Sequence, residues 1–263
     1  MERTKYPTNL SDAQWQRIEP MLPPPSRVGA PRRVERRNAV DAMLYIVRTG
    51  CQWRMLPADF PNWRTVYGLF WEWRNSGLWD RIHDALRDCV RRRAGRRTSP
   101  RVAVIDSQSV KTTEAGGERG YDAAKKINGR KRHIVVDSLG LLLGVVVHAA
   151  GLPDHDGACF ALARMDGLFR RLRVIWADSA YARNDLPTWV RETFGWAIRI
   201  VLRPAGAKGW VTLPKRWIVE RTFAWIGRCR RHSKDYERTT ESSEAMIKIA
   251  MIHLMLRRLE PST

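Results

Sequence analysis

The sequence predicts an α/β protein in which a small all-α region, with a helix-turn-helix-like pair, precedes a mixed sheet flanked by helices. Apolar residues recur at helical spacing over roughly the first ninety residues, as in RRNAVDAMLYIVRTG. Short β-rich runs replace that spacing after RRRAGRRTSPR (91–101), a basic stretch that contains a proline. This change of pattern predicts a helical domain at 1–98 and an α/β domain at 99–263.

Four helices are expected in the first domain. Ser11 and Gln14 have the spacing of a capping box, which opens a helix over about 12–22. The second helix ends at Gly50, and Asn62 caps the third, which runs through WRTVYGLFWEWRNSG. The fourth, WDRIHDALRDCVRRR, ends in three arginines that suit the negative end of a helix dipole.

The second and third helices, at 38–49 and 62–75, have the order of a helix-turn-helix with an enlarged connection. In that arrangement Arg64 and Thr65 open a recognition helix. Aromatic side chains crowd the same region: Trp53, Trp63, Trp71, Trp73 and Trp79. They could stack on bases beside the arginines, but a small helical core built around large aromatics is the better interpretation for most of them.

The second domain begins with three strands and continues with alternating helices and strands. The expected strands are VAVID (102–106), HIVVD (133–137), LLLGVVVHA (141–149), RVIWAD (173–178) and WAIRIVLR (196–203). The expected helices lie at 156–170, 185–194, 216–231 and 242–259. A tight turn, SLG, joins the second and third strands. This order makes a mixed α/β sheet.

The chain is strongly basic. Its 263 residues include 47 Lys and Arg against 27 Asp and Glu, which gives a net charge of +20. Such an excess favours a polyanionic partner, and the planar fork of arginine suits phosphate groups. Charge alone, however, also fits a generic basic protein.

Cysteine usage and apolar runs exclude other classes of protein. The four cysteines lie far apart and form no Cys-x-x-Cys pair, which argues against a zinc knuckle or a disulfide scaffold. The N-terminal MERTKYPTNL lacks the apolar core of a signal peptide. The longest apolar run, LGLLLGVVV, is far shorter than the ~20 residues that a membrane span requires. The sequence therefore predicts a soluble, cytoplasmic protein with no membrane partner.

Three acidic residues of the second domain lie on apolar elements. Asp106 and Asp178 each end an apolar strand and precede a serine, whereas Glu220 lies among apolar helical residues one turn beyond Arg216. If the two strands are neighbours, their carboxylates face each other, which is costly unless a cation lies between them. Hard oxygen ligands of this kind suit Mg²⁺ or Mn²⁺.

Each acid also has a simpler explanation. Asp106 or Asp178 alone could cap or form a turn after its strand, and Glu220 alone could pair with Arg216. Asp137 also ends a strand, but the SLG that follows makes it a turn residue. The order of the three acids, strand, strand and helix, in a strongly basic chain favours a metal site.

At these residues the chain resembles the DDE transposases of bacterial insertion sequences, specifically those of insertion-sequence family five. AVIDSQSVKTT resembles the first-Asp motif, VIWADSAY the second-Asp motif and RWIVERTFAWIGRCRRHSKDYE the Glu motif. Segments at 10–24, 45–57 and 120–157 are similar to other parts of that family, so the likeness covers nearly the whole chain.

The Glu motif departs from the Tyr-x2-Arg-x3-Glu-x6-Lys pattern of the wider group. Arg216 and Glu220 fit that pattern, but Leu213 and Gly227 stand where the Tyr and the Lys are expected. The roles of those two residues are therefore unassigned, and a neighbouring arginine, Arg228 or Arg231, could supply the terminal-DNA contact.

The resemblance implies an RNase H-like catalytic domain with two Mg²⁺ or Mn²⁺ ions, Asp106 being shared by both ions and Asp178 and Glu220 each completing one site. It implies cleavage at the ends of an insertion sequence, followed by attack of the freed 3′-hydroxyl on target DNA. The implied partners are double-stranded DNA, as terminal inverted repeats and as target, and further copies of the chain in a homodimer or higher synaptic assembly. Such a protein would be associated with the nucleoid.

Basic residues near these motifs are candidates for DNA contacts, although any one of them could be a solvated surface charge. They are Arg64, Lys111, Lys125, Lys126, Arg130, Lys131, Arg132, Arg216, Arg228 and Arg231. Two other functions stay open: a DNA-binding regulator that has lost catalysis, and a plain metal-dependent nuclease. The intact set of acids counts against the first, and the end-specific N-terminal region against the second.

Overall fold

The structure, a computed structural model, describes residues 6–24, 34–202 and 215–261. The chain divides into two compact units. The helical unit comprises Met1–Ala94, Gly227–Ser233 and Ala245–Thr263, and the sheet unit comprises Gly95–Ile226 and Lys234–Glu244. Two C-terminal segments, which the sequence assigned to the second domain, therefore group with the helical unit.

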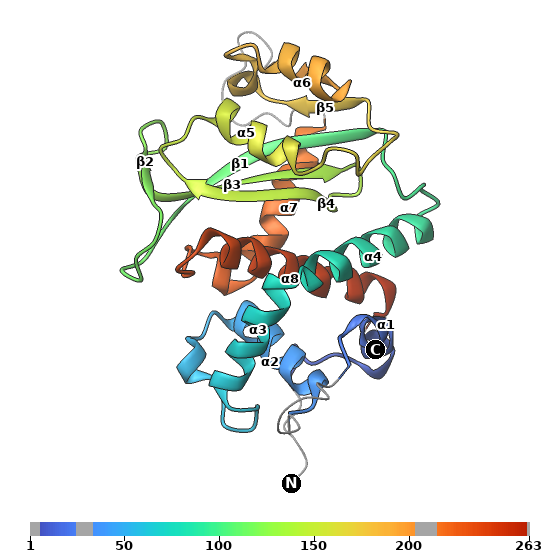
Figure 1. The fold of residues 1–263 in the computed structure, drawn as a ribbon, viewed down its shortest axis with the longest axis vertical. Helices are drawn as coiled ribbons and strands as arrows, with labels where there is room; N and C mark the ends of the chain where they lie inside the picture. The colour runs from blue at the N-terminus through green and yellow to red at the C-terminus, as the bar shows by residue number, and fades with distance from the viewer. Residues whose placement is uncertain (1–5, 25–33, 203–214, 262–263) are drawn as a thin grey trace. The chain divides into compact units, whose positions relative to one another are not determined.

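The helical unit contains α1 (Asp12–Ile18), α2 (Arg36–Thr49), α3 (Trp63–Asn75), α4 (Leu78–Arg93) and most of α8 (Thr240–Leu259), labelled in Figure 1. The predicted helix ends are present. Ser11 and Gln14 form a capping box, and the Asn62 side chain accepts a hydrogen bond from the Arg64 N–H. Gly50 ends α2 with a φ of 75°, a left-handed conformation that favours glycine.

Two of the five tryptophans in this region lie in the core of the helical unit. Trp73 and Trp79 are buried and meet edge to face, with ring centroids 5.6 Å apart. Trp71 is 52% exposed, and Trp53 and Trp63 are half-buried. No helix of the described residues is long and apolar enough to cross a membrane.

The sheet unit contains six strands in one mixed sheet. They are β1 (Val102–Lys111), β2 (Gly120–Asp122), β3 (Ile127–Asp137), β4 (Leu142–Ala149), β5 (Val174–Ala177) and β6 (Ala197–Ile200). The order is β2-β3-β1-β5-β6, and β4 also pairs with β3. β1 lies antiparallel to β3 and parallel to β5. The predicted α/β fold, a mixed sheet with flanking helices after a helical region, is confirmed.

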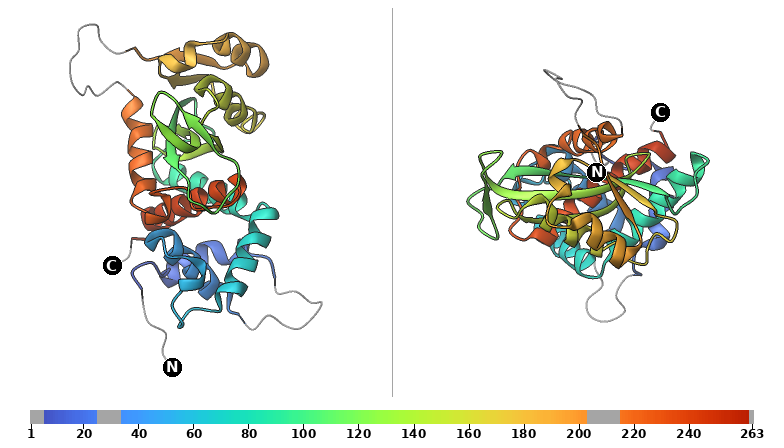
Figure 2. Two further views of the ribbon diagram at one scale, coloured as in Figure 1. Left: turned by 90° about the vertical axis from the view of Figure 1, so that its left-hand side faces the viewer. Right: turned by 90° about the horizontal axis from the view of Figure 1, so that it is seen from above.

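Helices cover both faces of this sheet (Figure 2). On one face, α5 (Asp154–Ala163) and α6 (Leu186–Phe194) pack with Ala103, Ile105 and other buried residues into the main core. α7 (Arg216–Gly227) lies on the other face. Because successive strand residues point to opposite faces, Asp106 faces α7 while Ser107 and Ser109 face α5.

Several predicted boundaries are wrong. β1 continues five residues beyond Asp106, and β3 begins at Ile127 instead of 133, because these two strands pair continuously from Ala103↔Asp137 to Lys111↔Gly129. β2 was not predicted. α5 ends at Ala163 and α7 at Gly227, earlier than expected. β6 ends at Ile200, short of the strand expected at 196–203. Residue 203 and Leu213 lie outside the described residues.

The free edge of β4 is covered by side chains. The Val147 N–H donates to the Glu244 carboxylate and the Ala149 N–H to Glu118, both at 3.0 Å, while Arg164 donates to the Val145 carbonyl at 3.2 Å. These contacts satisfy backbone groups that would otherwise offer a template for another strand.

The close contact between β3 and β1 predicts that Gly129→Ala destabilises the sheet unit. A Cβ at Gly129 would lie 2.0 Å from the Val110 carbonyl oxygen, whereas one at Gly151 would meet its nearest neighbour at 3.4 Å. We expect Gly129→Ala to lower the free energy of unfolding by roughly 1–3 kcal/mol and Gly151→Ala to change it little. Urea unfolding followed by circular dichroism measures both. Equal effects would show that β3 can shift to accommodate the methyl group.

Candidate active site

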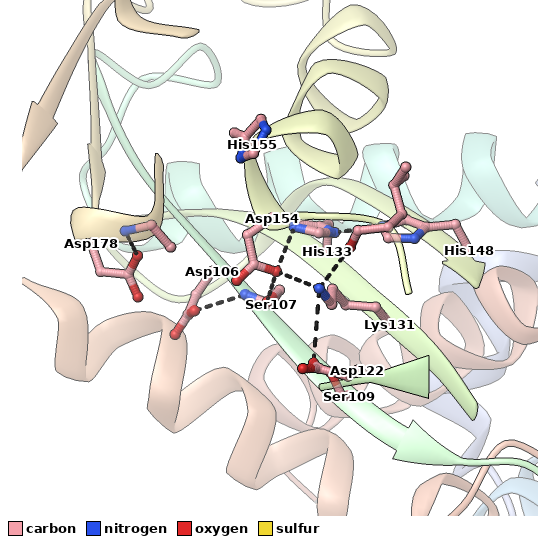
Figure 3. Close-up of polar contacts among 12 residues, drawn as sticks. Asp106, Ser107, Ser109, Asp122, Lys131, His133, His148, Asp154, His155 and Asp178 are labelled. Atoms are coloured by element: carbon pink, nitrogen blue, oxygen red, sulfur yellow. Dashed lines mark hydrogen bonds and ion pairs between the residues drawn. The ribbon is translucent and has the colours of Figure 1, made fainter. Parts of the chain in front are cut away.

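Two of the predicted acids lie side by side. β1 and β5 are parallel and in register at Val104↔Trp176, so Asp106 and Asp178 each stand two residues further along neighbouring strands. Asp178 directly follows β5, and its Oδ1 accepts a hydrogen bond from the Ala180 N–H at 2.9 Å. Asp106 lies within β1 and not at its end. Figure 3 shows the two side chains next to each other.

A single arginine joins the two carboxylates. Arg216, at the start of α7, places its Nη2 3.3 Å from the Asp106 Oδ2 and 3.4 Å from the Asp178 Oδ2. The sequence argument required a cation between these acids, and in this structure the guanidinium group supplies it.

Burial dominates the electrostatics of the pair. It raises the pKa of Asp106 to about 6, and the neighbouring Asp178 carboxylate adds to the rise, while Arg216 and the Ser107 N–H oppose it. Burial alone would lower the pKa of Arg216, but the two aspartates raise it above its ordinary value. Arg216 therefore offsets only part of the cost of burying the negative charge of Asp106.

Glu220 lies on the same helix as Arg216, one turn later, and is half-buried. Its charge also contributes to the raised pKa of Arg216. Among the described residues, no three His, Cys, Asp or Glu side chains are grouped closely enough to hold a metal ion. The structure thus brings Asp106 and Asp178 together, and the participation of Glu220 stays a prediction.

A buried polar network supports the acid pair from the α5 face (Figure 3). The Asp106 Oδ1 accepts the Ser107 N–H at 2.7 Å, and the Ser107 hydroxyl donates to the Asp154 Oδ1 at 2.8 Å. Lys131 lies 2.9 Å from that same oxygen and 3.8 Å from Asp122, and it donates to the Leu152 carbonyl at 2.8 Å. The chain of contacts fixes the strand that carries Asp106.

Two histidines extend this network. The His148 Nδ1 is 2.8 Å from the Ala149 carbonyl and therefore carries the proton, so in the neutral pair the His133 Nδ1–H donates to the His148 Nε2 at 2.9 Å. Burial lowers the pKa of both imidazoles. A Cβ at Gly157 would lie 2.4 Å from both rings, so only glycine fits against them.

Comparisons with known proteins decide the family. Residues 97–255 match the model described as "Transposase DDE domain", and residues 10–83 match "Putative transposase of IS4/5 family". The chain belongs to the DDE transposases. Its predicted membership of that family, in its insertion-sequence branch, is confirmed.

Curated relatives carry related names. The chain is 29% identical over 160 residues, 58% of its length and 73% of the relative's, to the "Putative transposase for insertion sequence element IS402" of Burkholderia cepacia. It is 34% identical over 117 residues, 42% of its length and 78% of the relative's, to the "Insertion element IS402 uncharacterized 16.2 kDa protein" of the same organism.

Sequence reasoning missed several residues in and around the aspartate pair. Tyr181, three residues after Asp178, is buried, and burial followed by the charges of Asp106, Asp154 and Asp178 raises its pKa. The sequence DSAY places Tyr181 three residues after Asp178, on a short 3₁₀ helix (Ser179–Ala182), and this spacing could have indicated that the two side chains lie close together. His133 and His148 looked scattered in the sequence, because only the pairing of β3 with β4 brings them together.

The predicted DNA-contact residues fall into two sets. Those that are exposed are Arg64, Lys111, Lys125, Lys126 and Arg228. Those that are buried are Arg130, Lys131, Arg132 and Arg231. The structure does not support phosphate contacts by the buried set, because their charged groups already bind protein oxygens. Arg216 is half-buried against the two aspartates.

Arg130 illustrates the correction. It is fully buried and donates to the carbonyl groups of Glu118, Glu237 and Arg238 at 2.8–2.9 Å, with the Asp235 carboxylate 3.3 Å away. A cation on a central strand can be buried only when its donors are satisfied in this way.

The raised pKa of Asp106 predicts how the stability of the metal-free transposase depends on pH. The folded chain binds this proton more tightly than the unfolded chain, so ionisation destabilises the fold as pH rises from about 4 through about 6. Asp106→Asn cannot ionise and therefore does not lose stability in this way as the pH rises. In the presence of a chelator, the variant should melt at a higher temperature than the wild type at about pH 8 and at the same temperature near pH 4.

Thermal scans across this pH range measure the difference. Asp166→Asn, a change at an exposed aspartate of the same unit, is the control and should follow the wild type. If Asp106→Asn melts below the wild type at about pH 8, the attraction between Asp106 and Arg216 outweighs burial.

Proposed function

We propose that this transposase cleaves the ends of an insertion sequence and joins the freed 3′-hydroxyls to target DNA. The supporting observation is the pair of carboxylates on adjacent parallel strands, held together by one cationic group. A buried pair of like charges has no structural advantage over apolar side chains. Its presence therefore favours a site that binds cations.

The residues at this site fit divalent metal ions. All the candidate metal ligands are carboxylate oxygens, which suit Mg²⁺ or Mn²⁺ and not zinc. The Arg216 guanidinium already occupies a position beside them that a cation can take. Asp106 would hold two ions, with Asp178 and Glu220 each holding one of them. Bound ions would lower the pKa of the attacking water or 3′-hydroxyl and stabilise the leaving oxygen.

The chain's own residues would prepare that site. The Ser107–Asp154–Lys131 network keeps the Asp106 carboxylate in one orientation. Arg216 neutralises the two aspartates in the metal-free site. With the aspartates holding divalent ions instead, its planar fork would suit a DNA phosphate. Glu220, one turn along α7, adds a third acidic charge near the same arginine.

Double-stranded DNA is the proposed partner, both as terminal inverted repeats and as target. The exposed lysines Lys111, Lys125 and Lys126 would bind phosphates near the catalytic strands, and α3 would read the repeats through Arg64. We propose a homodimer or higher synaptic assembly, because the reaction joins two ends. Fragment 1–98 lacks segments of the helical unit, so experiments should use the full chain.

Substitution of the acids tests the catalytic proposal. Asp106→Asn, Asp178→Asn and Glu220→Gln each remove a ligand charge and keep the side-chain shape. Each should reduce Mg²⁺-dependent cleavage of labelled repeat DNA by more than about 100-fold, the upper end of the loss caused by outer-shell changes. DNA affinity should stay nearly unchanged, because it depends on basic residues elsewhere.

The exposed Asp166→Asn variant is again the matched control and should cleave normally. Full activity of Glu220→Gln would remove Glu220 from the site while leaving the aspartate pair. DNA binding by the wild type without cleavage or joining in either Mg²⁺ or Mn²⁺ would favour the regulator, and cleavage without joining would favour the nuclease.

Replacing a basic residue by methionine should have different effects in the buried and the exposed sets of predicted DNA-contact residues: loss of stability in the first and loss of DNA affinity in the second. Arg130→Met removes one partner of a buried ion pair and should lower the free energy of unfolding by roughly 3–5 kcal/mol. Lys111→Met should leave stability unchanged, weaken DNA binding and reduce the salt slope by about 0.9. Melting curves and DNA titrations at several salt concentrations measure both. A stable Arg130→Met variant with weakened DNA binding would return Arg130 to the DNA-contact set.

A further inference from the structure

A small surface pocket lies in the helical unit where α3 begins. Its walls are Gln52, Trp53, Arg54, Trp63 and Tyr67, and its volume is about 330 Å³. Trp53 and Arg54 belong to a short 3₁₀ helix (Trp53–Met55), and Trp63 is the first residue of α3. This volume is at the lower end of the range for small-molecule sites.

Two of the three aromatic walls, Trp53 and Tyr67, are held in place before any ligand binds. Trp53 meets Tyr67 edge to face at 5.1 Å between ring centroids, and it packs against Phe70 at 5.4 Å. Phe70 is buried, whereas Tyr67 is 42% exposed. Trp53 and Tyr67 are therefore anchored through Phe70 to the core and remain partly open to solvent. This arrangement lowers the entropy lost on binding.

Two arginines flank the pocket. The guanidinium carbons of Arg54 and Arg64 lie 5.4 Å and 5.5 Å from the Trp63 ring centroid, within the range of cation–π contact. Both arginines are exposed, and neither has a carboxylate partner within 4.0 Å in the described part of the chain. Their charges are therefore available to an anionic ligand beside the rings.

This combination selects the chemistry of the ligand. Stacking surfaces suit a planar ring, the Gln52 amide offers both a donor and an acceptor, and the two guanidinium groups suit phosphates on either side of that ring. The N-terminus of α3 adds further positive potential. An organic cation would also stack on aromatic rings, but the two arginines repel it.

We propose that this pocket receives one unpaired nucleobase of DNA, with its flanking phosphates bound by Arg54 and Arg64. A base inside a duplex has both faces covered by its neighbours, so the pocket would take a base from a single strand, a frayed end or a flipped nucleotide. The inference rests on the DNA binding proposed above and adds a second mode of contact to it. α3 would then hold unpaired as well as paired DNA.

A comparison of two single strands tests the pocket. Fluorescence anisotropy would give the affinity of the full-length protein for labelled oligothymidylate and for an abasic strand of equal length. The wild type should prefer the strand with bases. Trp63→Ala should weaken oligothymidylate binding by between about fivefold and about 150-fold and leave abasic binding unchanged. Trp63→Phe, which keeps a stacking ring, should retain most of the preference.

Trp71→Ala is the matched control, because Trp71 is on the same helix, is 52% exposed and does not line the pocket. It should bind both strands as the wild type does. Arg54→Ala combined with Arg64→Ala should weaken binding of both strands and reduce the salt slope, since each neutralised phosphate contributes about 0.7 to that slope for single strands. If Trp63→Ala does not fold, Tyr67→Ala makes the same comparison.

Each contrary result has a distinct meaning. Equal affinity of the wild type for both strands, with binding to repeat duplex intact, overturns the pocket and leaves the proposed function standing. No binding to any DNA overturns both. Release of oligothymidylate by tetramethylammonium, but not by thymidine monophosphate, would assign the pocket to an organic cation and overturn the nucleobase proposal.

Discussion

The sheet unit is organised around two like charges that the fold forces together. Parallel pairing of β1 with β5 fixes Asp106 and Asp178 at one level of the sheet, so a cation must lie beside them. The cation comes from α7. Thr222 donates to the Gly140 carbonyl at 2.9 Å, which anchors the helix to the β3–β4 turn and presents Arg216 to both acids.

On the opposite face of β1, a lysine balances another carboxylate. Ser107 points away from α7 and binds Asp154, whose charge is balanced by the buried Lys131. A buried network with some unsatisfied members is less stable than an apolar core. Removing one of these groups would therefore leave the others without their partners. Asp106 is thus bound by Arg216 on one face of β1, and the contacts of Ser107 on the other face fix the strand that carries it.

The sequence predicted the elements whose signals are local and missed those that depend on pairing. The capping box at Ser11, the stop at Gly50 and the apolar strands were visible because each follows from neighbouring residues. The extension of β1 through SQSVK was not, since these residues are strand only by pairing with β3. Arg130 was a candidate DNA contact because charged side chains are seldom fully buried. Its four oxygen partners lie 12 or more residues away in the sequence, so nothing next to it in the chain indicated its burial.

Arg216 gives the site a way to couple its ligands. One guanidinium group has three acidic neighbours, Asp106 in β1, Asp178 after β5 and Glu220 in α7. It cannot share the two aspartates with divalent ions without strong repulsion. Metal binding, as proposed, would therefore release a cation next to β1 and β5, and a DNA phosphate would be its natural partner. By reciprocity, DNA that binds Arg216 would raise the affinity of the acids for metal. A transposase built in this way would assemble its charged site fully only when substrate and metal are both present.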